Sequence, residues 1–189
     1  MVRWTDVTMS RRTRRCAPPG PPMAEAAIEP LRADHDLSGF SCGVSSLDAW
    51  LHTRAPRNQA TGDSRTFVLL ADGKVGGFYA LSTASAVRAA LTGPLRRNAP
   101  DPVPLLLLGQ LAVDARWHRA GFGRRLLGDA CLLALDVSPR AGFRALATHP
   151  VDAAPERFYA RFGFVAVPDS IPALMVLSID RLGAAARAV

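Results

Sequence analysis

Short apolar runs alternate with longer amphipathic stretches along most of the chain. Short runs rich in apolar and β-branched residues are typical of strands. They predict strands at Ile28–Leu31, Thr66–Ala71, Val75–Leu81, Pro104–Val113, Ala145–Thr148, Phe164–Val167 and Ala173–Ser178. The pair Asp72-Gly73 between the second and third runs predicts a hairpin. The continuous apolar run of Pro104–Val113 predicts a buried strand.

Three segments carry apolar residues at helical spacing. They are Ser45–Gln59, Gly121–Leu135 and Asp152–Arg161. Ser45 or Ser46 is expected to cap the first helix. The inward residues expected on the second helix are Phe122, Leu126, Ala130 and Leu133. Residues 83–103 are predicted to form a long polar loop. Strands that alternate with helices in this way predict an α/β fold.

Composition narrows the class of protein. A chain of 189 residues has the length of one domain, and 49% hydrophobic residues are enough for a sizeable core. The longest strongly apolar stretch, Pro104–Val113, is too short to cross a bilayer. Cys16, Cys42 and Cys131 share no CxxC spacing, so a zinc site or a disulfide framework is not expected. We therefore expect free thiols, no metal, no membrane association and a cytoplasmic location.

The basic charge is uneven along the chain. The net charge is +7, yet residues 1–22 hold five arginines before a Pro/Gly-rich run. No apolar stretch follows Arg15, so these residues do not resemble a secretory signal. We expect residues 1–23 to be a disordered, dispensable tail, with Met23 as a plausible true start, and residues 24–189 to be one domain. The remaining body is only moderately basic, so the total charge overstates any case for nucleic acid.

The segment that follows the fourth predicted strand has features that favour the binding of an anion. Its basic loop leads into a helix that begins among Gly121 and Gly123. The first amides of a helix have no intrahelical acceptor, and two glycines let a ligand approach the backbone. The spacing fits neither the dinucleotide-binding motif nor the P-loop. A diphosphate is the natural ligand; the alternative is a tight turn with a solvated arginine face.

The run His118-Arg119-Ala120-Gly121-Phe122-Gly123 resembles the pyrophosphate motif of the GNAT family of N-acetyltransferases. His118 stands where that family has Gln or Arg. The resemblance implies acetyl-CoA as co-substrate, no metal, and a central mixed, mostly antiparallel twisted sheet of six to seven strands flanked by helices. The cofactor-binding residues it implies are Leu111, Ala112, Val113, His118, Arg119, Ala120, Gly121, Phe122, Gly123 and Arg124.

A second match, Arg157–Phe164, is similar to the "FYxxFGF" segment of the same family. The resemblance implies that Tyr159 lies beside the thioester sulfur, where its phenol protonates the departing thiolate. A phenol with a pKa of about 10 is protonated at neutral pH and is able to act as an acid. The alternative is a tyrosine that simply packs on an amphipathic helix.

Three further segments resemble the GNAT toxins of bacterial toxin–antitoxin pairs. They are His35–Leu51, Asn58–Val68 and Leu95–Pro104, and the whole likeness runs from Asp34 to Ile179. It implies acetylation of the α-amino group of aminoacyl-tRNA, a block of translation, a ribbon–helix–helix antitoxin as partner and a possible homodimer. Arg65, Arg88, Arg96 and Arg97 are the candidate substrate contacts; the alternative for each is a solvated surface side chain.

The expected chemistry is direct attack of an amine on a thioester held in line. Strand amides near Ala112 and Val113 are able to stabilise the developing oxyanion. An α-amino group has a pKa of about 7.7–8.0, so a strong base is optional. His118, His149 and Asp152 are candidate bases, although a structural role is expected for each. Two other functions stay open: acetylation of a protein N-terminus or a small amine, and a non-catalytic binding module.

Overall fold

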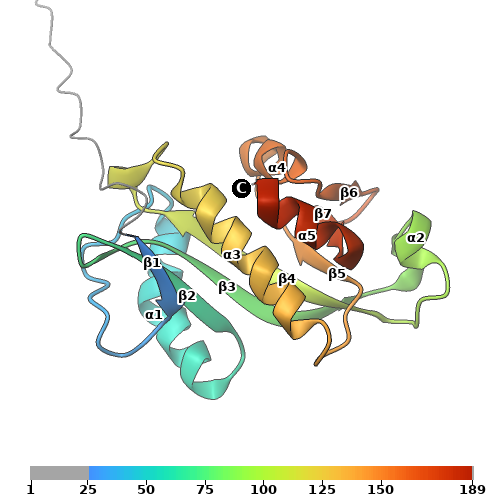
Figure 1. Cartoon of the computed structure of the whole chain (residues 1–189), viewed down its shortest axis with the longest axis horizontal. Coiled ribbons are helices and arrows are strands. Elements are labelled where there is room, and N and C mark those ends of the chain that lie inside the picture. Colours follow the sequence, from blue (N-terminus) through green and yellow to red (C-terminus); the bar gives the residue numbers. More distant parts are fainter. Residues whose placement is uncertain (1–25, 189) are drawn as a thin grey trace, which may run out of the picture.

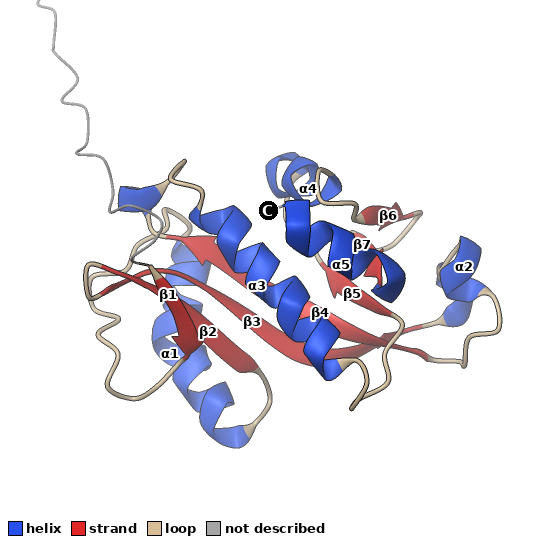
Figure 2. Ribbon diagram, viewed as in Figure 1, coloured by secondary structure: helices blue, strands red, loops and turns tan. Residues whose placement is uncertain are grey.

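One sheet of seven strands runs through residues 26–188, the part of the chain that the computed structural model describes (Figures 1 and 2). The strands are β1 (Ala27–Pro30), β2 (Arg65–Ala71), β3 (Lys74–Ala86), β4 (Val103–Val113), β5 (Ala145–Thr148), β6 (Val165–Val167) and β7 (Leu174–Ser178). Their order is β1-β2-β3-β4-β5-β7-β6, and only β4 and β5 are parallel neighbours. The predicted mixed, mostly antiparallel sheet is confirmed, and the predicted tail lies outside the described residues.

Helices cover both faces of this sheet. The helices are α1 (Ser45–Thr61), η1 (Arg88–Ala90), α2 (Gly93–Arg96), η2 (Ala115–Trp117), α3 (Phe122–Val137), α4 (Ala153–Ala160) and α5 (Ile179–Ala188). On one face, called the α1 face here, α1 covers one part of the sheet and segment 87–102 covers another. On the other, called the α3 face, α3, α4 and α5 pack together (Figure 2). No helix in the described range is long and apolar enough to span a bilayer.

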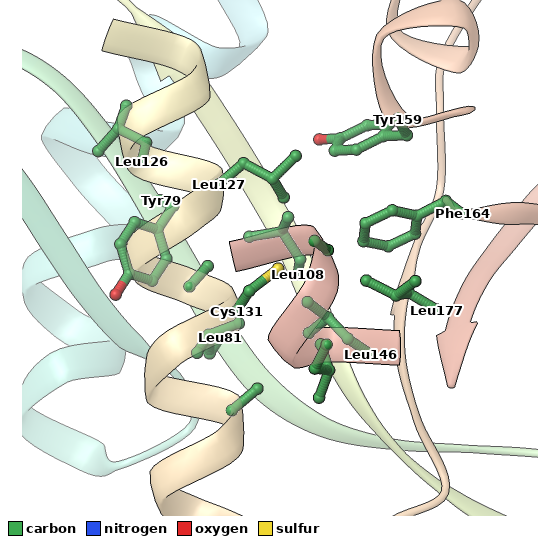
Figure 3. Close-up of a cluster of buried hydrophobic side chains, with 14 of the residues drawn as sticks. Tyr79, Leu81, Leu108, Leu126, Leu127, Cys131, Leu146, Tyr159, Phe164 and Leu177 are labelled. Carbon is green, nitrogen blue, oxygen red and sulfur yellow. The ribbon is translucent and has the colours of Figure 1, made fainter. Parts of the chain in front are cut away.

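The α3 face holds the largest cluster of buried side chains (Figure 3). Phe122, Leu126 and Ala130 of α3 are buried in it, as their helical spacing predicts, and Leu133 is half-buried at its margin. Full burial of a phenylalanine or leucine side chain contributes about 1.5–3 kcal/mol. Tyr79 stacks on Phe67 and donates its hydroxyl to Asp129 Oδ2 over 2.6 Å. The cluster fixes α3 across the centre of the sheet.

Two sequence predictions are wrong in detail, and one helix was not predicted. The polar loop expected from residue 83 begins later, because residues 83–86 continue β3 and pair with 103–106 of β4. Neither Ser45 nor Ser46 caps α1: the N-cap is Val44, and the Asp48 carboxylate instead accepts from the Cys42 amide and the Ser41 hydroxyl. Helix α5 was not predicted, although its buried residues Leu182 and Ala185 lie at helical spacing.

Strand β4 departs from the prediction of a strand buried throughout. Its Cα pairing with β5 is confined to residues 106 and 107. A shift in register against β3 leaves Gly109 without a partner, which makes a β-bulge, and Gly109 is exposed. From residue 108 to residue 113, therefore, one edge of β4 faces no other strand of the described chain.

Candidate active site

The connection from β4 to α3 bends sharply and presents backbone amides. Arg119 and Gly121 both have positive φ angles, 66° and 87°. Gly121 is the N-cap of α3, no side chain caps the helix, and the first turn carries no acidic residue. The amides of this turn and the positive end of the helix dipole are therefore open to an anion. The anion site predicted from the sequence falls on this turn and stays a prediction.

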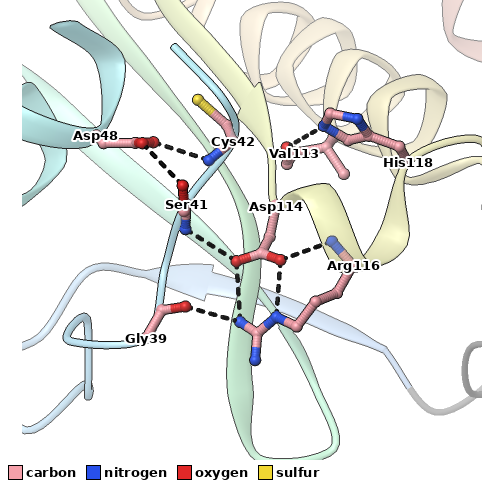
Figure 4. A network of polar contacts seen from close by, with 8 residues as sticks. All are labelled: Gly39, Ser41, Cys42, Asp48, Val113, Asp114, Arg116 and His118. Atoms are coloured by element: carbon pink, nitrogen blue, oxygen red, sulfur yellow. Dashed lines mark hydrogen bonds and ion pairs between the residues drawn. The ribbon is translucent and has the colours of Figure 1, made fainter. Parts of the chain in front are cut away.

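The side chains around these amides differ in what they do. His118 Nε2 lies 2.9 Å from the carbonyl oxygen of Val113 and ties the loop to the end of β4 (Figure 4). Arg124 donates to the carbonyl of Ala188, the last described residue of α5, over 3.0 Å. Arg119 is exposed beside the turn. Of the charged residues predicted here, Arg119 has the fewest structural ties and is the best placed to meet a ligand.

Most apolar residues predicted at this site serve the core. Phe122 is buried against Trp117, with ring centroids 6.1 Å apart. Leu111 and Val113 pack against the α3-face cluster, whereas Ala112 is buried under α1 on the opposite face. Along the unpaired edge of β4, the backbone groups of these residues are open to a ligand, and their side chains are not. The sequence alone did not separate residues that pack in the core from residues whose backbone is open.

Gly123 is where three elements meet. A Cβ atom placed on it would lie 3.8 Å from the Phe158 ring of α4 and 3.8 Å from a methyl group of Val113. The amide turn of α3, the end of β4 and helix α4 thus surround one point. Phe158 was not predicted as a site residue; its place beside Tyr159 in the sequence was the available signal.

Tyr159 lies on α4 and points toward α3 (Figure 3). Its ring is buried, and Phe158 and Phe164 contact it with centroids 5.3 Å away. Burial raises the pKa of its phenol, and a hydrogen bond with Thr148 opposes that rise. The phenol therefore stays protonated at neutral pH, which is the state an acid requires.

Thr148 holds the two halves of the sheet at the point where their backbone pairing stops. Its hydroxyl donates to the carbonyl of Leu108 over 3.0 Å, just beyond the last β4–β5 pair. The side chain is buried and the same hydroxyl lies beside the Tyr159 phenol. Sequence reasoning missed Thr148, because a lone threonine at the end of a strand carries no signal of such a contact.

A network of polar contacts anchors the loop before α1 to the end of β4 (Figure 4). Asp114 accepts hydrogen bonds from the backbone amide of Ser41 and from the guanidinium and amide of Arg116. Burial acts to raise the pKa of this carboxyl, but the contacts with Arg116 and Ser41 outweigh it and lower the pKa below its ordinary value. The network fixes the strand end from which the amide turn starts, and it was also missed.

The four arginines predicted to contact a substrate fall into two kinds. Arg65 donates to the carbonyl of Gln59 at the end of α1 over 2.8 Å, and Arg88 donates to the carbonyl of Ala99 over 3.2 Å. Both guanidinium groups therefore stabilise local structure. Arg96 and Arg97 are exposed on segment 87–102. In Figure 1 this segment, around α2, lies far from the start of β2, so the structure does not bring all four together.

The remaining candidate groups have structural partners. His149 Nδ1 lies 2.8 Å from the carbonyl oxygen of Ala173, and Asp152 caps α4 by accepting from the Ala154 amide over 2.7 Å. Cys131 is buried in the core, and burial raises the pKa of its thiol to about 12. Cys42 and Cys131 are both free, whereas Cys16 lies outside the described residues. Within residues 26–188, no cluster of side chains is suited to hold a metal ion.

Known proteins resemble both the sequence and the fold. The acetyltransferase (GNAT) domain model matches residues 62–166. A tRNA-acetylating toxin of Mycobacterium tuberculosis is 41% identical over 145 residues, which cover 77% of this chain and 87% of the relative.

Two solved structures show the same fold. AtaT complexed with acetyl-methionyl-tRNAfMet has a TM-score of 0.79 and 24% identity, and the match covers 85% of this chain and 98% of that one. A mutant AtaT toxin bound to the C-terminus of the antitoxin AtaR and to acetyl-CoA has a TM-score of 0.73 and 24% identity, with coverage of 85% and 97%.

Proposed function

The chain belongs to the GNAT family of acetyltransferases, and from this premise we propose that it transfers the acetyl group of acetyl-CoA to the α-amino group of aminoacyl-tRNA. One observation carries the proposal. The uncapped amide turn of α3 and Tyr159 of α4 both lie on the α3 face, and the edge of β4 that they adjoin has no strand partner beyond residue 107. This geometry suits a thioester whose far end carries a diphosphate.

The donor fits what the residues offer. The amides of the first turn of α3 would bind the diphosphate, and Gly121 and Gly123 keep side chains out of its way. Backbone groups along the edge of β4 beyond residue 107 would pair with the amide-containing arm of the coenzyme. The arm would then enter the gap between β4 and β5, with its thioester beside Tyr159.

The acetyl transfer needs one acid and no covalent enzyme intermediate. A neutral amine forms the new N–C bond at the acetyl carbonyl, the C–S bond breaks, and Tyr159 would donate its proton to the departing thiolate. The amine releases its extra proton to solvent, from which the phenol recovers its own. Amides of β4 would stabilise the negative charge that develops on the carbonyl oxygen. The α-amine has a pKa of about 7.7–8.0, so no strong base is required.

We propose Arg96 and Arg97 as phosphate contacts for the tRNA. Both are exposed, and arginines bind phosphates through several N–H donors. Arg65 and Arg88 already bind backbone carbonyls and would act indirectly, by holding α1 and segment 87–102 in place. We propose in addition that the chain works in the cytoplasm, where charged tRNA is found, and that a small ribbon–helix–helix antitoxin and a second copy of the chain are its partners.

The direct test incubates the purified protein with labelled acetyl-CoA and a pool of charged tRNA. We expect label on the aminoacyl-tRNA from wild-type protein. Tyr159→Phe should lower the transfer rate by about a hundredfold or more, because the acid is lost, while coenzyme A still binds in calorimetry.

A folded wild-type protein that labels no aminoacyl-tRNA would refute the tRNA substrate. Labelling of a peptide N-terminus or a small amine in the same assay would instead support the alternative acceptor. Full activity of Tyr159→Phe would remove the tyrosine from the mechanism and leave the family assignment intact.

A further inference from the structure

Gly109 occupies an unusual place in the sheet. The register shift between β3 and β4 leaves it without a partner, and it lies beyond the last backbone pair between β4 and β5. Its neighbours along the strand are buried or half-buried, whereas Gly109 itself is exposed. Gly109 is therefore the exposed residue of β4, and it lies where β4 and β5 separate. Every other residue of β4 is at least partly covered.

Glycine is common at a β-bulge, but neither backbone strain nor packing requires it at this position. Gly109 is absent from the residues with positive φ, so its backbone conformation suits any L-residue. A Cβ atom there would meet only the side chain of Leu107, at 3.9 Å, which is ordinary contact. Glycine in a strand costs stability relative to a β-branched residue. Glycine inside a strand often marks a bulge or the close approach of a ligand or another backbone, and an exposed bulge glycine at the point where two strands separate fits both.

Gly109 is open on the face of the sheet opposite the proposed donor site. The missing side chain of Gly109 would project on the face of Leu107, which packs under segment 87–102 on the α1 face. The adjacent Leu108 projects on the α3 face, in the same cluster as Tyr159. Ala112, further along β4, is buried under α1. Gly109 thus lies between the two covered parts of the α1 face.

We propose that Gly109 keeps clear the place where the acyl acceptor meets the donor, and so limits the size of the group carried next to the reacting nitrogen. The inference rests on the proposed function, in which the donor occupies the α3 face. The reacting amine must then reach the gap between β4 and β5 from the α1 face. For aminoacyl-tRNA, the group next to the nitrogen is the amino acid side chain, so residue 109 would select among aminoacyl groups.

The experiment compares Gly109→Ala and Gly109→Val with wild-type protein, using tRNAs charged with glycine, methionine and phenylalanine. We expect both variants to fold and to bind coenzyme A with unchanged affinity. Transfer to methionyl- and phenylalanyl-tRNA should fall by about tenfold or more in Gly109→Val, and transfer to glycyl-tRNA should fall less. Gly109→Ala should show the same order with smaller losses.

Gly142→Val is the matched control, because Gly142 is also exposed, has an ordinary φ and has open space around its Cβ position. It should leave all rates unchanged. Wild-type rates in both Gly109 variants would overturn the inference, as would equal losses for every aminoacyl group or weakened coenzyme binding. If the wild-type protein acetylates only another amine, a size series of that amine replaces the tRNAs; if it acetylates none, the proposed function and this inference both fail.

Discussion

At the scale of single residues, the proposed acid depends on a neighbour that sequence reasoning did not find. The Thr148 hydroxyl donates to the Leu108 carbonyl and lies beside the Tyr159 phenol. One buried side chain thereby joins the separating strands and positions the group that would protonate the leaving thiolate. Burial of Tyr159 keeps its phenol in the protonated form.

Thr148→Val removes the hydroxyl at nearly constant volume. We expect kcat to fall by about five- to tenfold, because the phenol loses its positioning contact, while the affinity for coenzyme A changes little. Thr148→Ser should restore most of the rate. In a Tyr159→Phe background the valine change should have no further effect on kcat, and an independent loss in that double variant would show that Thr148 acts through the fold alone.

At the scale of elements, the first turn of α3 combines two properties that one substitution can separate. The turn lacks an acidic residue, although such residues stabilise helix N-termini. Gly123 has room for a Cβ atom beside Phe158 and Val113. The helix therefore forgoes a stabilising charge at the place where a diphosphate would bind.

Gly123→Asp should raise the melting temperature or leave it unchanged, because the carboxylate interacts favourably with the helix dipole. The same carboxylate repels a diphosphate, so we expect the Kd for coenzyme A in calorimetry to rise by about tenfold or more. Gly123→Asn is the matched control, since it has the same size without the charge and should weaken binding much less. Equal affinities of the two variants would contradict an anion site at this turn.

At the scale of the whole molecule, the two faces of the sheet present different groups. The α3 face offers amides and the buried phenol of Tyr159, and the α1 face carries the exposed Gly109 between α1 and segment 87–102. Segment 87–102 also presents Arg96 and Arg97. A large charged acceptor would thus approach from one side of the sheet while the donor occupies the other.

A double variant, Arg96→Ala with Arg97→Ala, tests this arrangement through its salt dependence. Removing two phosphate contacts should reduce the slope of log K against log salt concentration for tRNA binding by about 1–2. The measurement is a titration of tRNA at several salt concentrations, with thermal unfolding as a check on the fold. Arg65→Ala is the comparison: it should lower the melting temperature by removing the contact with the Gln59 carbonyl, and change the slope less. An unchanged slope in the double variant would place the tRNA elsewhere.

The sequence determined the class of fold and the backbone of the candidate site. Apolar runs and helical periods are local, so they located every strand to within a few residues, apart from the extension of β3 to Ala86. The glycines of the β4–α3 turn signalled an anion site because backbone geometry at Gly121 depends on residue type. At α5 the helical spacing of Leu182 and Ala185 was present but was overlooked, and at the N-cap of α1 the local signal failed.

Only the tertiary structure decided which residues work together. Thr148 and Leu108 are 40 positions apart, and Asp114 and Ser41 are 73 apart, so neither contact leaves a pattern along the chain. In the folded chain, Arg65 and Arg88 donate hydrogen bonds to backbone carbonyls, whereas Arg96 and Arg97 are exposed. Composition alone does not reveal this difference. Side-chain partners depend on how distant strands and helices pack, and the order of β4, β5 and α4 in space is set by burial over the whole sheet.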